Sequence, residues 1–372
     1  MITERRSLTF VIPCVLVAGL LWAAVPTAQT RSATLVVVLN EKTGSTLGII
    51  DPVAGKIIAR VPTGRDPHIV AASEDGTLAF VANTNGHGQT IPDGDSISVI
   101  DIAARKEIRR VHAGFGTSPL DIQAAGGKVY FSASGYKALG RYDPVRDKVD
   151  YFGLGQDGPS NFIVSKDLKA IFAVNPRSNS VSILENFVEG PILRYPAKPT
   201  DWKHTEVPVG KGPSGIAMSP DGKEVWTINE EEGAGSSIIN VATRTVRTIE
   251  LPTEHAVRLR FTPDGRRVLI LDRAQQSGSG QIVVVDTATR KPIKQIRFTG
   301  DKSGERMSAG NLVVVPDGSR AYVTVNPLSG GGRNYIAVID LKALTMSSRI
   351  EIGGDCRAGA VCGNGLAWAA PK

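Results

Sequence analysis

A single turn signal recurs along this chain and limits what it can fold into. The signal is Pro-Asp-Gly or a close variant, and it occurs at 74–76, 125–127, 166–167, 220–222, 263–265 and 316–318. Proline presets φ and glycine accepts positive φ, so the signal is typical of tight turns between strands. A short β-prone run follows each turn, at 78–83, 129–132, 170–175, 225–229, 268–271 and 321–326. The repeat of roughly 40 to 54 residues indicates one structural unit used many times.

Two further strand-like runs complete the unit. Second runs at 97–101, 181–184, 282–286 and 336–340 lead through a turn to third runs such as 107–111 and 292–298. With the run before each Pro-Asp-Gly turn, the unit has four antiparallel strands, which is a propeller blade. We find no helical periodicity of useful length.

Counting the units predicts how the ring closes. Six complete units span 65–112, 117–154, 158–210, 212–251, 255–298 and 306–352. The segment 34–61 supplies only three strands, and 363–369 resembles the missing first strand. Joining the two ends pairs edges that would otherwise stay open. We therefore predict an all-β, seven-bladed β-propeller of four-stranded antiparallel blades, a single domain over 34–372 with one blade closed by both termini.

The first 28 residues are expected to form a signal peptide. Arg5 and Arg6 precede an uncharged apolar run from Leu8 to Ala24, and small polar residues follow. This order is typical of secretory signals, with cleavage near Ala28. The alternative is a retained membrane anchor, since a run of about 17 residues is at the lower limit for spanning a bilayer. We expect a periplasmic or secreted protein with no stable membrane insertion after signal removal.

Cysteine use and charge agree with export. Cys14 lies inside the signal segment, so Cys356 and Cys362 remain in the mature chain. Two cysteines this close in an oxidising compartment are expected to form a disulfide, the alternative being two free thiols. The net charge of +7 includes no dense run of Lys and Arg. Nucleic-acid binding is therefore not expected.

The repeat segments resemble the YVTN family of β-propeller repeats. The resemblance is carried by Ala79–Asn85, Ser96–Asp101 and Ala321–Asn326, with Gly64–Pro67 and Gly210–Pro213 as companion segments. It covers essentially the whole mature chain and implies the propeller fold. It implies little about activity, because the wider superfamily includes lactonases, a lyase, dehydrogenase subunits and surface-layer or adhesion modules. Function must be argued from the site.

Polar residues gather in loops that a propeller places around the mouth of its central channel. In this strand order, the loops leading into each first strand share one face with the loops between second and third strands, and we call it the loop face. Several arginines there could bind a carboxylate or phosphate bidentately. The alternative is that such loops are polar in every propeller. The candidate ligand-binding residues are Arg65, Asn85, Asp121, Asn161, Arg258, Arg273, Arg306, Asn311 and Arg333.

Histidines and acids on the loop face are candidates for catalysis. His68 and His255 lie at nearly the same phase of the repeat in different blades, and the acids considered with them are Asp66, Glu230 and Asp121. A histidine beside a carboxylate can act as a general base or a metal ligand. No H-x-E-x-H or comparable ligand spacing accompanies them.

The loop 86–96 is a second candidate metal site. It contains His87, Asp93 and Asp95, and the two carboxylates could supply oxygen ligands for calcium. The loop lacks the full EF-hand pattern, and the alternative is a solvated turn. The sequence identifies no cofactor. A divalent metal is the kind of cofactor that these residues could hold.

Three functions remain open from the sequence. The first is an exported scaffold that binds a small polar or anionic ligand, or another extracytoplasmic protein, at the channel mouth. The second is a lactonase-like hydrolase or a lyase that uses His and acid residues. The third is the propeller subunit of a periplasmic dehydrogenase complex. The chain contains no P-loop, G-x-S-x-G or C-x-x-C-H motif, which favours the first.

Overall fold

The structure is a computed structural model of the chain. It describes residues 32–41, 44–84, 95–154, 159–185, 203–231, 235–273, 277–328, 333–353 and 365–370. Residues 32–372 belong to one compact unit. The predicted signal peptide and the predicted disulfide, Cys356 with Cys362, lie outside the described residues. Within the described part, no helix has the length and apolarity that crossing a membrane requires.

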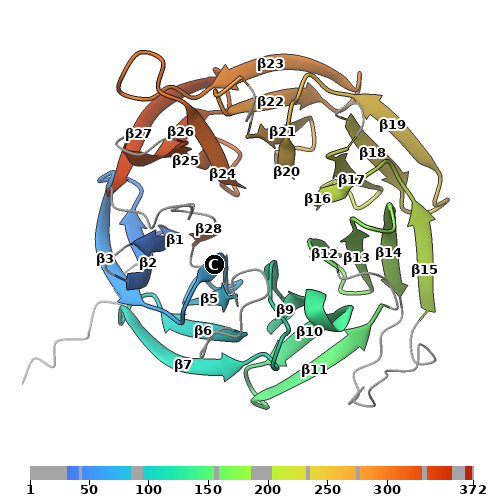
Figure 1. The fold of residues 1–372 in the computed structure, drawn as a ribbon, viewed down its shortest axis with the longest axis horizontal. Coiled ribbons are helices and arrows are strands. Elements are labelled where there is room, and N and C mark those ends of the chain that lie inside the picture. The colour runs from blue at the N-terminus through green and yellow to red at the C-terminus, as the bar shows by residue number, and fades with distance from the viewer. Residues whose placement is uncertain are drawn as a thin grey trace, which may run out of the picture. The chain divides into compact units, whose positions relative to one another are not determined.

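Seven four-stranded antiparallel sheets form a ring, and we number them as blades 1 to 7 (Figure 1). From the channel outward, blades 1 to 4 consist of β28 (Leu366–Ala369), β1 (Thr34–Glu41), β2 (Gly44–Asp51) and β3 (Lys56–Pro62); β4 (Pro67–Ala72), β5 (Leu78–Asn83), β6 (Ser96–Asp101) and β7 (Lys106–His112); β8 (Ile122–Ala125), β9 (Lys128–Ala133), β10 (Ala138–Asp143) and β11 (Lys148–Gly153); and β12 (Phe162–Val164), β13 (Ala170–Asn175), β14 (Ser180–Glu185) and β15 (Lys203–Pro208).

Blades 5 to 7 repeat the same order. They consist of β16 (Pro213–Met218), β17 (Glu224–Asn229), β18 (Gly235–Asn240) and β19 (Val246–Glu250); β20 (Ala256–Phe261), β21 (Arg267–Asp272), β22 (Gln281–Asp286) and β23 (Lys291–Arg297); and β24 (Met307–Val314), β25 (Arg320–Pro327), β26 (Asn334–Asp340) and β27 (Thr345–Gly353). A short 3-10 helix, η2 (Ser134–Tyr136), joins β9 to β10.

Blade 1 closes the ring with strands from both ends of the chain. β28 pairs antiparallel with β1, from Thr34 opposite Ala369 to Val37 opposite Leu366. This pairing covers the inner edge of β1, which would otherwise be an open edge. The prediction of seven four-stranded blades, one of them shared between the termini, is confirmed.

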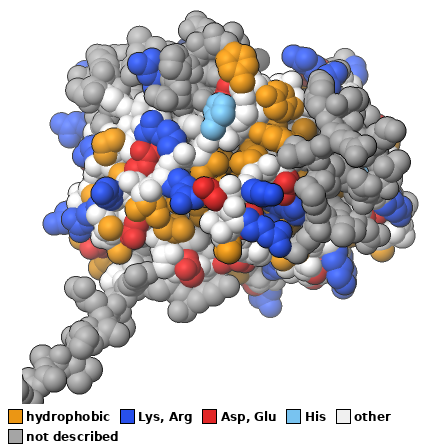
Figure 2. Space-filling view, turned by 90° about the horizontal axis from the view of Figure 1, so that it is seen from below, with side chains coloured by type: hydrophobic (Ala, Val, Ile, Leu, Met, Phe, Trp, Pro, Cys, Tyr) orange, Lys and Arg blue, Asp and Glu red, His pale blue; other side chains and the backbone are white. Residues whose placement is uncertain are grey.

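The hydrophobic core lies between neighbouring blades. Second and third strands such as β21 and β22 are apolar and buried along almost their whole length. One cluster joins Trp226 of blade 5 to Leu259 and Ile270 of blade 6. The outer strand β23 is exposed at all but one residue. On the side of the ring that carries β7 and β11, Figure 2 shows Lys and Arg interspersed with Asp and Glu, so no single-sign patch dominates that side.

The recurring Asn of the repeat ties strands together inside the blade. The Asn83 side chain donates from Nδ2 to the hydroxyls of Ser96 at 3.0 Å and Ser98 at 3.1 Å. The backbone N–H of Gly64 also donates to the Ser98 hydroxyl at 3.0 Å. Asn175 makes the equivalent pair of bonds in blade 4. Buried polar groups need such partners, so these motif residues stabilise the blade.

In blades 2 and 5 the glycine before the first strand, Gly64 or Gly210, makes room for this asparagine, so Gly210→Ala is expected to destabilise the protein by about 4 kcal/mol. An alanine Cβ at 210 would lie 2.3 Å from Nδ2 of Asn229, which must then move and lose its bond to Ser237. Urea unfolding followed by circular dichroism measures the change. The control is Gly222→Ala, where φ is +73° but no atom lies within 4 Å, so only about 1 to 2 kcal/mol is expected. Equal losses in the two variants would contradict the steric argument.

Candidate functional site

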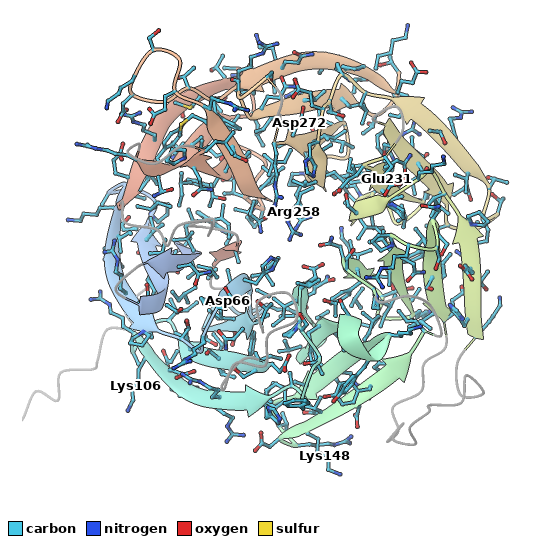
Figure 3. The ribbon with its side chains drawn as sticks, in the orientation of Figure 1. Asp66, Lys106, Lys148, Glu231, Arg258 and Asp272 are labelled. Carbon is cyan, nitrogen blue, oxygen red and sulfur yellow. The ribbon has the colours of Figure 1, made fainter. Side chains whose placement is uncertain are left out.

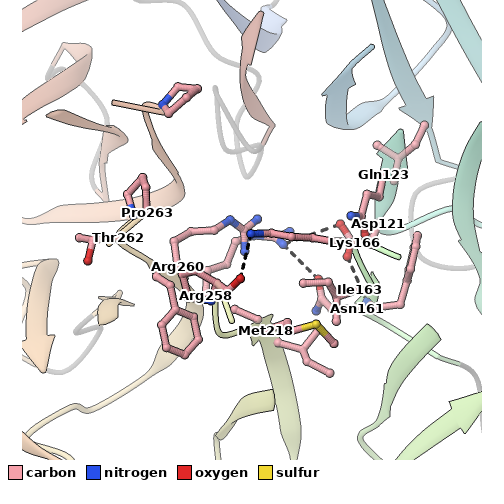
Figure 4. Close-up of a pocket in the computed structure, with 17 residues that line it drawn as sticks. Asp121, Gln123, Asn161, Ile163, Lys166, Met218, Arg258, Arg260, Thr262 and Pro263 are labelled. Atoms are coloured by element: carbon pink, nitrogen blue, oxygen red, sulfur yellow. Dashed lines mark hydrogen bonds and ion pairs between the residues drawn. The ribbon is translucent and has the colours of Figure 1, made fainter. Parts of the chain in front are cut away.

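A cavity of about 540 Å³ lies in the central channel (Figure 4). Its wall comes from the inner strands β8, β12, β16 and β20, with Pro316 added by blade 7. Its exposed lining residues, Lys166, Pro263 and Pro316, belong to the turns between first and second strands. The cavity therefore opens on the face of the ring that carries these turns, which we call the turn face. We expected the ligand-binding residues on the opposite face, the loop face.

Two arginines of β20 define the polar end of this cavity. Arg258 and Arg260 alternate with the buried Leu259, so both side chains leave the same side of the strand. Arg258 points into the centre of the ring in Figure 3. Its Nη1 donates to Oδ1 of Asn161 at 3.1 Å and lies 3.9 Å from Oδ1 of Asp121. All three were among the nine predicted ligand-binding residues, and the structure places these three together.

Asp121 also holds two blades together. Its buried carboxylate accepts the backbone N–H of Phe162, in the inner strand of the next blade, at 3.2 Å. Two residues on, Gln123 accepts the N–H of Val164 in the same way at 2.9 Å. Side chains at and just before the start of β8 thus satisfy donors on the free inner edge of β12.

Burial controls the charges in the cavity. Burial raises the pKa of the Asp121 carboxyl, an effect that the Arg258 charge opposes. Burial lowers the pKa of the Arg260 guanidinium to about 10, and repulsion from Arg258 adds to this. Arg260 therefore stays cationic at neutral pH. Of the lining residues, Lys166, Arg258 and Arg260 are cationic and Asp121 is the one carboxylate.

Sequence reasoning did not single out Arg260, Lys166 or Met218 as lining residues. The available signal was the Arg258-Leu259-Arg260 alternation, which puts two charges on one face of an inner strand. A charge that faces the channel is expensive to bury without a partner, so a pair of such charges indicates a site.

Two of the catalytic candidates meet on the loop face. Nε2 of His255 lies 3.6 Å from Oε2 of Glu230, which belongs to the preceding blade. Burial alone would raise the pKa of Glu230, but hydrogen bonds from His255 and Ser214, with the charges of His255 and Arg273, outweigh it and lower that pKa. Burial and then Arg258 lower the pKa of Arg273 itself.

Asp272 fixes the backbone that carries His255. It stands where other blades have the recurring asparagine, at the end of a second strand. Its carboxylate accepts the N–H groups of Glu254 at 3.1 Å and His255 at 2.8 Å, and the side-chain N–H of Gln281 at 3.0 Å. The His255 backbone is therefore held rigidly at the start of β20.

The other catalytic candidates have separate partners. Nδ1 of His68 lies 3.2 Å from the carbonyl oxygen of Leu120, and Asp66 accepts a hydrogen bond from Thr84 at 3.1 Å. The described interactions thus bring His255 to Glu230 and leave His68 and Asp66 in other contacts. Within the described residues, no group of three or more His, Cys, Asp or Glu is placed to hold a metal ion.

The remaining candidates are scattered. Asn311 was expected in a loop but lies buried inside β24 at a register shift, where its Oδ1 accepts the N–H of Leu312 at 2.7 Å. Asp95 is buried and accepts the N–H groups of Gly116 and Ser118, each at 2.7 Å, which ties the start of β6 to the connection that leads into blade 3. Arg65, Arg306 and Arg333 are exposed, and Asn85, His87 and Asp93 lie outside the described residues.

No protein-family model and no curated protein matches this chain. Among solved structures, a functionally unknown protein from Desulfotomaculum acetoxidans is 12% identical with a TM-score of 0.67, over 92% of this chain and 100% of that one. A protein from Bacteroides uniformis, named as a proposed 6-phosphogluconolactonase, is 16% identical with a TM-score of 0.63, over 91% and 100%.

A third similar structure is hydrazine synthase from Kuenenia stuttgartiensis, which is 17% identical. This chain spans 64% of that chain's length, with 75% of its own length covered and a TM-score of 0.43, which is too low to support an argument. At these identities the similarities show the seven-bladed propeller fold and nothing about activity.

Proposed function

We propose that this chain is an exported propeller of the YVTN kind that binds a small anionic ligand in its central channel. The observation that carries the proposal is that Arg258 and Arg260 line one cavity in which Asp121 is the single carboxylate. Lys166 adds a third cation where the cavity opens on the turn face. A volume of about 540 Å³ is within the range of small-molecule sites.

The two guanidinium groups keep most of their hydrogen-bonding capacity. A guanidinium has five N–H donors. Arg258 gives one hydrogen bond to the neutral Asn161 side chain, and Arg260 gives one to the carbonyl of Leu259. A ligand with a carboxylate or phosphate would accept bonds from both arginines. It would also neutralise charge that burial makes unfavourable.

Hydrolysis is less well supported than binding. It rests on the His255–Glu230 pair, whose two side chains are 3.6 Å apart and each about one-third exposed. The pair lies on the loop face, whereas the cavity opens on the turn face. The relative named as a lactonase shares only the fold at 16% identity.

Replacing Arg260 with Gln is expected to weaken the binding of small anions by about 30-fold, or roughly 2 kcal/mol. The substitution removes both the positive charge and the paired N–H donors that the guanidinium presents to the cavity. Titration calorimetry with acetate, hexanoate and inorganic phosphate measures the change. The matched control is Arg247→Gln, on the exposed face of the outer strand β19, which should bind as the unchanged protein does. Absence of binding to all three anions, or equal affinity in both variants, would rule the proposal out.

A further inference from the structure

The cavity has its two arginines at the deep end and apolar side chains nearer the turn face, where Gln123, Lys166 and Thr262 add polar groups. Along β20 Arg258 and Arg260 precede the turn that follows the strand, and along the chain into β12 Asn161 precedes Ile163. Both inner strands run toward the turn face, because each one ends at a turn between a first and a second strand. The arginines and Asn161 therefore lie deep, and Ile163 and Met218 lie nearer the opening.

Two apolar side chains from two inner strands, Ile163 of β12 and Met218 of β16, face the outer part of the cavity. Both pack partly against the core between blades 4 and 5. Each is only partly buried and also lines the cavity. Their remaining apolar surface is available to a ligand, and covering it is favourable.

The charges at the deep end set the charge of the ligand. Arg258 and Arg260 carry two positive charges, and an ionised Asp121 3.9 Å from Arg258 offsets one of them. Lys166 is exposed at the turn face, where water screens its positive charge, and its Nζ donates to the carbonyl of Pro220 at 3.1 Å. A ligand head group with one negative charge would neutralise the positive charge that remains at the deep end. A second negative charge would face Asp121 at close range, which costs energy in a buried site.

We propose that the ligand is a small monocarboxylic acid with an apolar body, an inference that rests on the proposed function. It enters from the turn face, places its carboxylate against Arg258 and Arg260, and leaves its apolar body against Ile163 and Met218. The site then selects both for one negative charge and for an apolar chain.

Calorimetry at pH 8 tests this ligand class with hexanoate and three further probes, each of which differs from hexanoate in one property. Hexanoate is expected to bind at least 10-fold more tightly than acetate, because each buried methylene is worth up to roughly fourfold in affinity. Hexanamide, which has the same chain without charge, should not bind measurably. Hexyl phosphate is largely a dianion at this pH and should bind more weakly than hexanoate.

A pair of matched variants locates the apolar contact. Met218→Gln keeps the length of the side chain but makes it polar, and should reduce hexanoate affinity about fivefold or more while leaving acetate unchanged. The control is Met346→Gln in the outer strand β27, where Met346 is exposed, and it should change neither affinity.

The outcomes separate this inference from the proposed function. Equal affinity for acetate and hexanoate, or no difference between the two Met variants, would overturn the apolar-body inference while anion binding through Arg260 stands. Tighter binding of hexyl phosphate than of hexanoate would overturn the single-charge part. Absence of binding to every anion would overturn the proposed function and this inference with it.

Discussion

A chain that lacks residues 365–372 is expected to lose its cooperative fold. These residues contain β28, the inner strand of blade 1, which pairs with four residues of β1. The N–H of Val38 also donates to the carbonyl of Gly365 at 2.9 Å. Without β28, the inner edge of β1 is left with unpaired donors and acceptors in the channel wall, and such buried groups cost stability.

The same strand holds blade 1 to both of its neighbours. Trp368 stacks on Tyr322 of blade 7 at 5.7 Å between ring centroids, and Leu366 is buried in that interface. On the other side, Gly365 approaches the backbone of Ile69 in blade 2 so closely that a Cβ would lie 2.6 Å from its Cα. Losing Trp and Leu contacts of this kind costs roughly 5 kcal/mol or more, which is comparable with the whole stability of a typical protein.

Size-exclusion chromatography and urea unfolding test the truncation. The shortened chain should elute as expanded or aggregated material without a sigmoidal unfolding transition. A chain that lacks only residues 371–372 keeps β28 and is the control. A shortened chain that unfolds at the same urea concentration as the control would show that six blades and the rest of blade 1 close without the C-terminal strand.

The fold could be predicted because its determinants are local and repeated. The Pro-Asp-Gly turns, the strand-ending asparagines such as Asn83, and the apolar runs each act within one blade. Ring closure followed from counting, since 34–61 lacked one strand and 363–369 supplied a matching pattern. None of these inferences needed a distance between residues far apart in the chain.

The site depends on such distances, and there prediction was partial. Asp121, Asn161 and Arg258 come from three different blades, and their contact depends on how strongly each inner strand tilts toward the channel. Arg260 was not predicted because it lies within a strand, whereas the candidate residues were taken from the loops expected around the channel mouth. Asn311 was misplaced because the register shift between Ala309 and Leu312 extends β24 past it, and a bulge has no clear sequence signal here.

Below about pH 4 the protein is expected to lose most of its unfolding free energy. Recurring aspartates close the turns of the blades: Ser219 donates to Asp221, for example, and Asp221 accepts the N–H of Lys223. Hydrogen bonds to the ionised form lower a carboxyl pKa. The described aspartates whose pKa is lowered are Asp75, Asp143, Asp167, Asp221, Asp264, Asp286, Asp317 and Asp340.

The sign of the pH effect follows from proton binding. A carboxyl with a lowered pKa in the folded state binds fewer protons there than in the unfolded chain, so its contribution is complete above the unfolded value of 3.8. That contribution is lost as pH falls through the folded value, which is about 2 for Asp143 because Lys128 donates to it at 2.8 Å. Urea unfolding between pH 7 and pH 2 should show a plateau above about pH 5 and a steep fall below pH 4.

Two Asp→Asn substitutions should change this profile in opposite directions. Asp143→Asn removes a carboxylate that the fold stabilises, so it should lower stability at pH 7 and make the fall below pH 4 shallower. Asp121→Asn removes a carboxylate whose pKa burial raises, and it keeps an oxygen for the N–H of Phe162. It should raise stability at pH 7 and lose that advantage as the pH falls, because the unchanged Asp121 then takes up its proton. The opposite signs distinguish specific carboxyl environments from a general loss of negative charge, which would move both variants the same way.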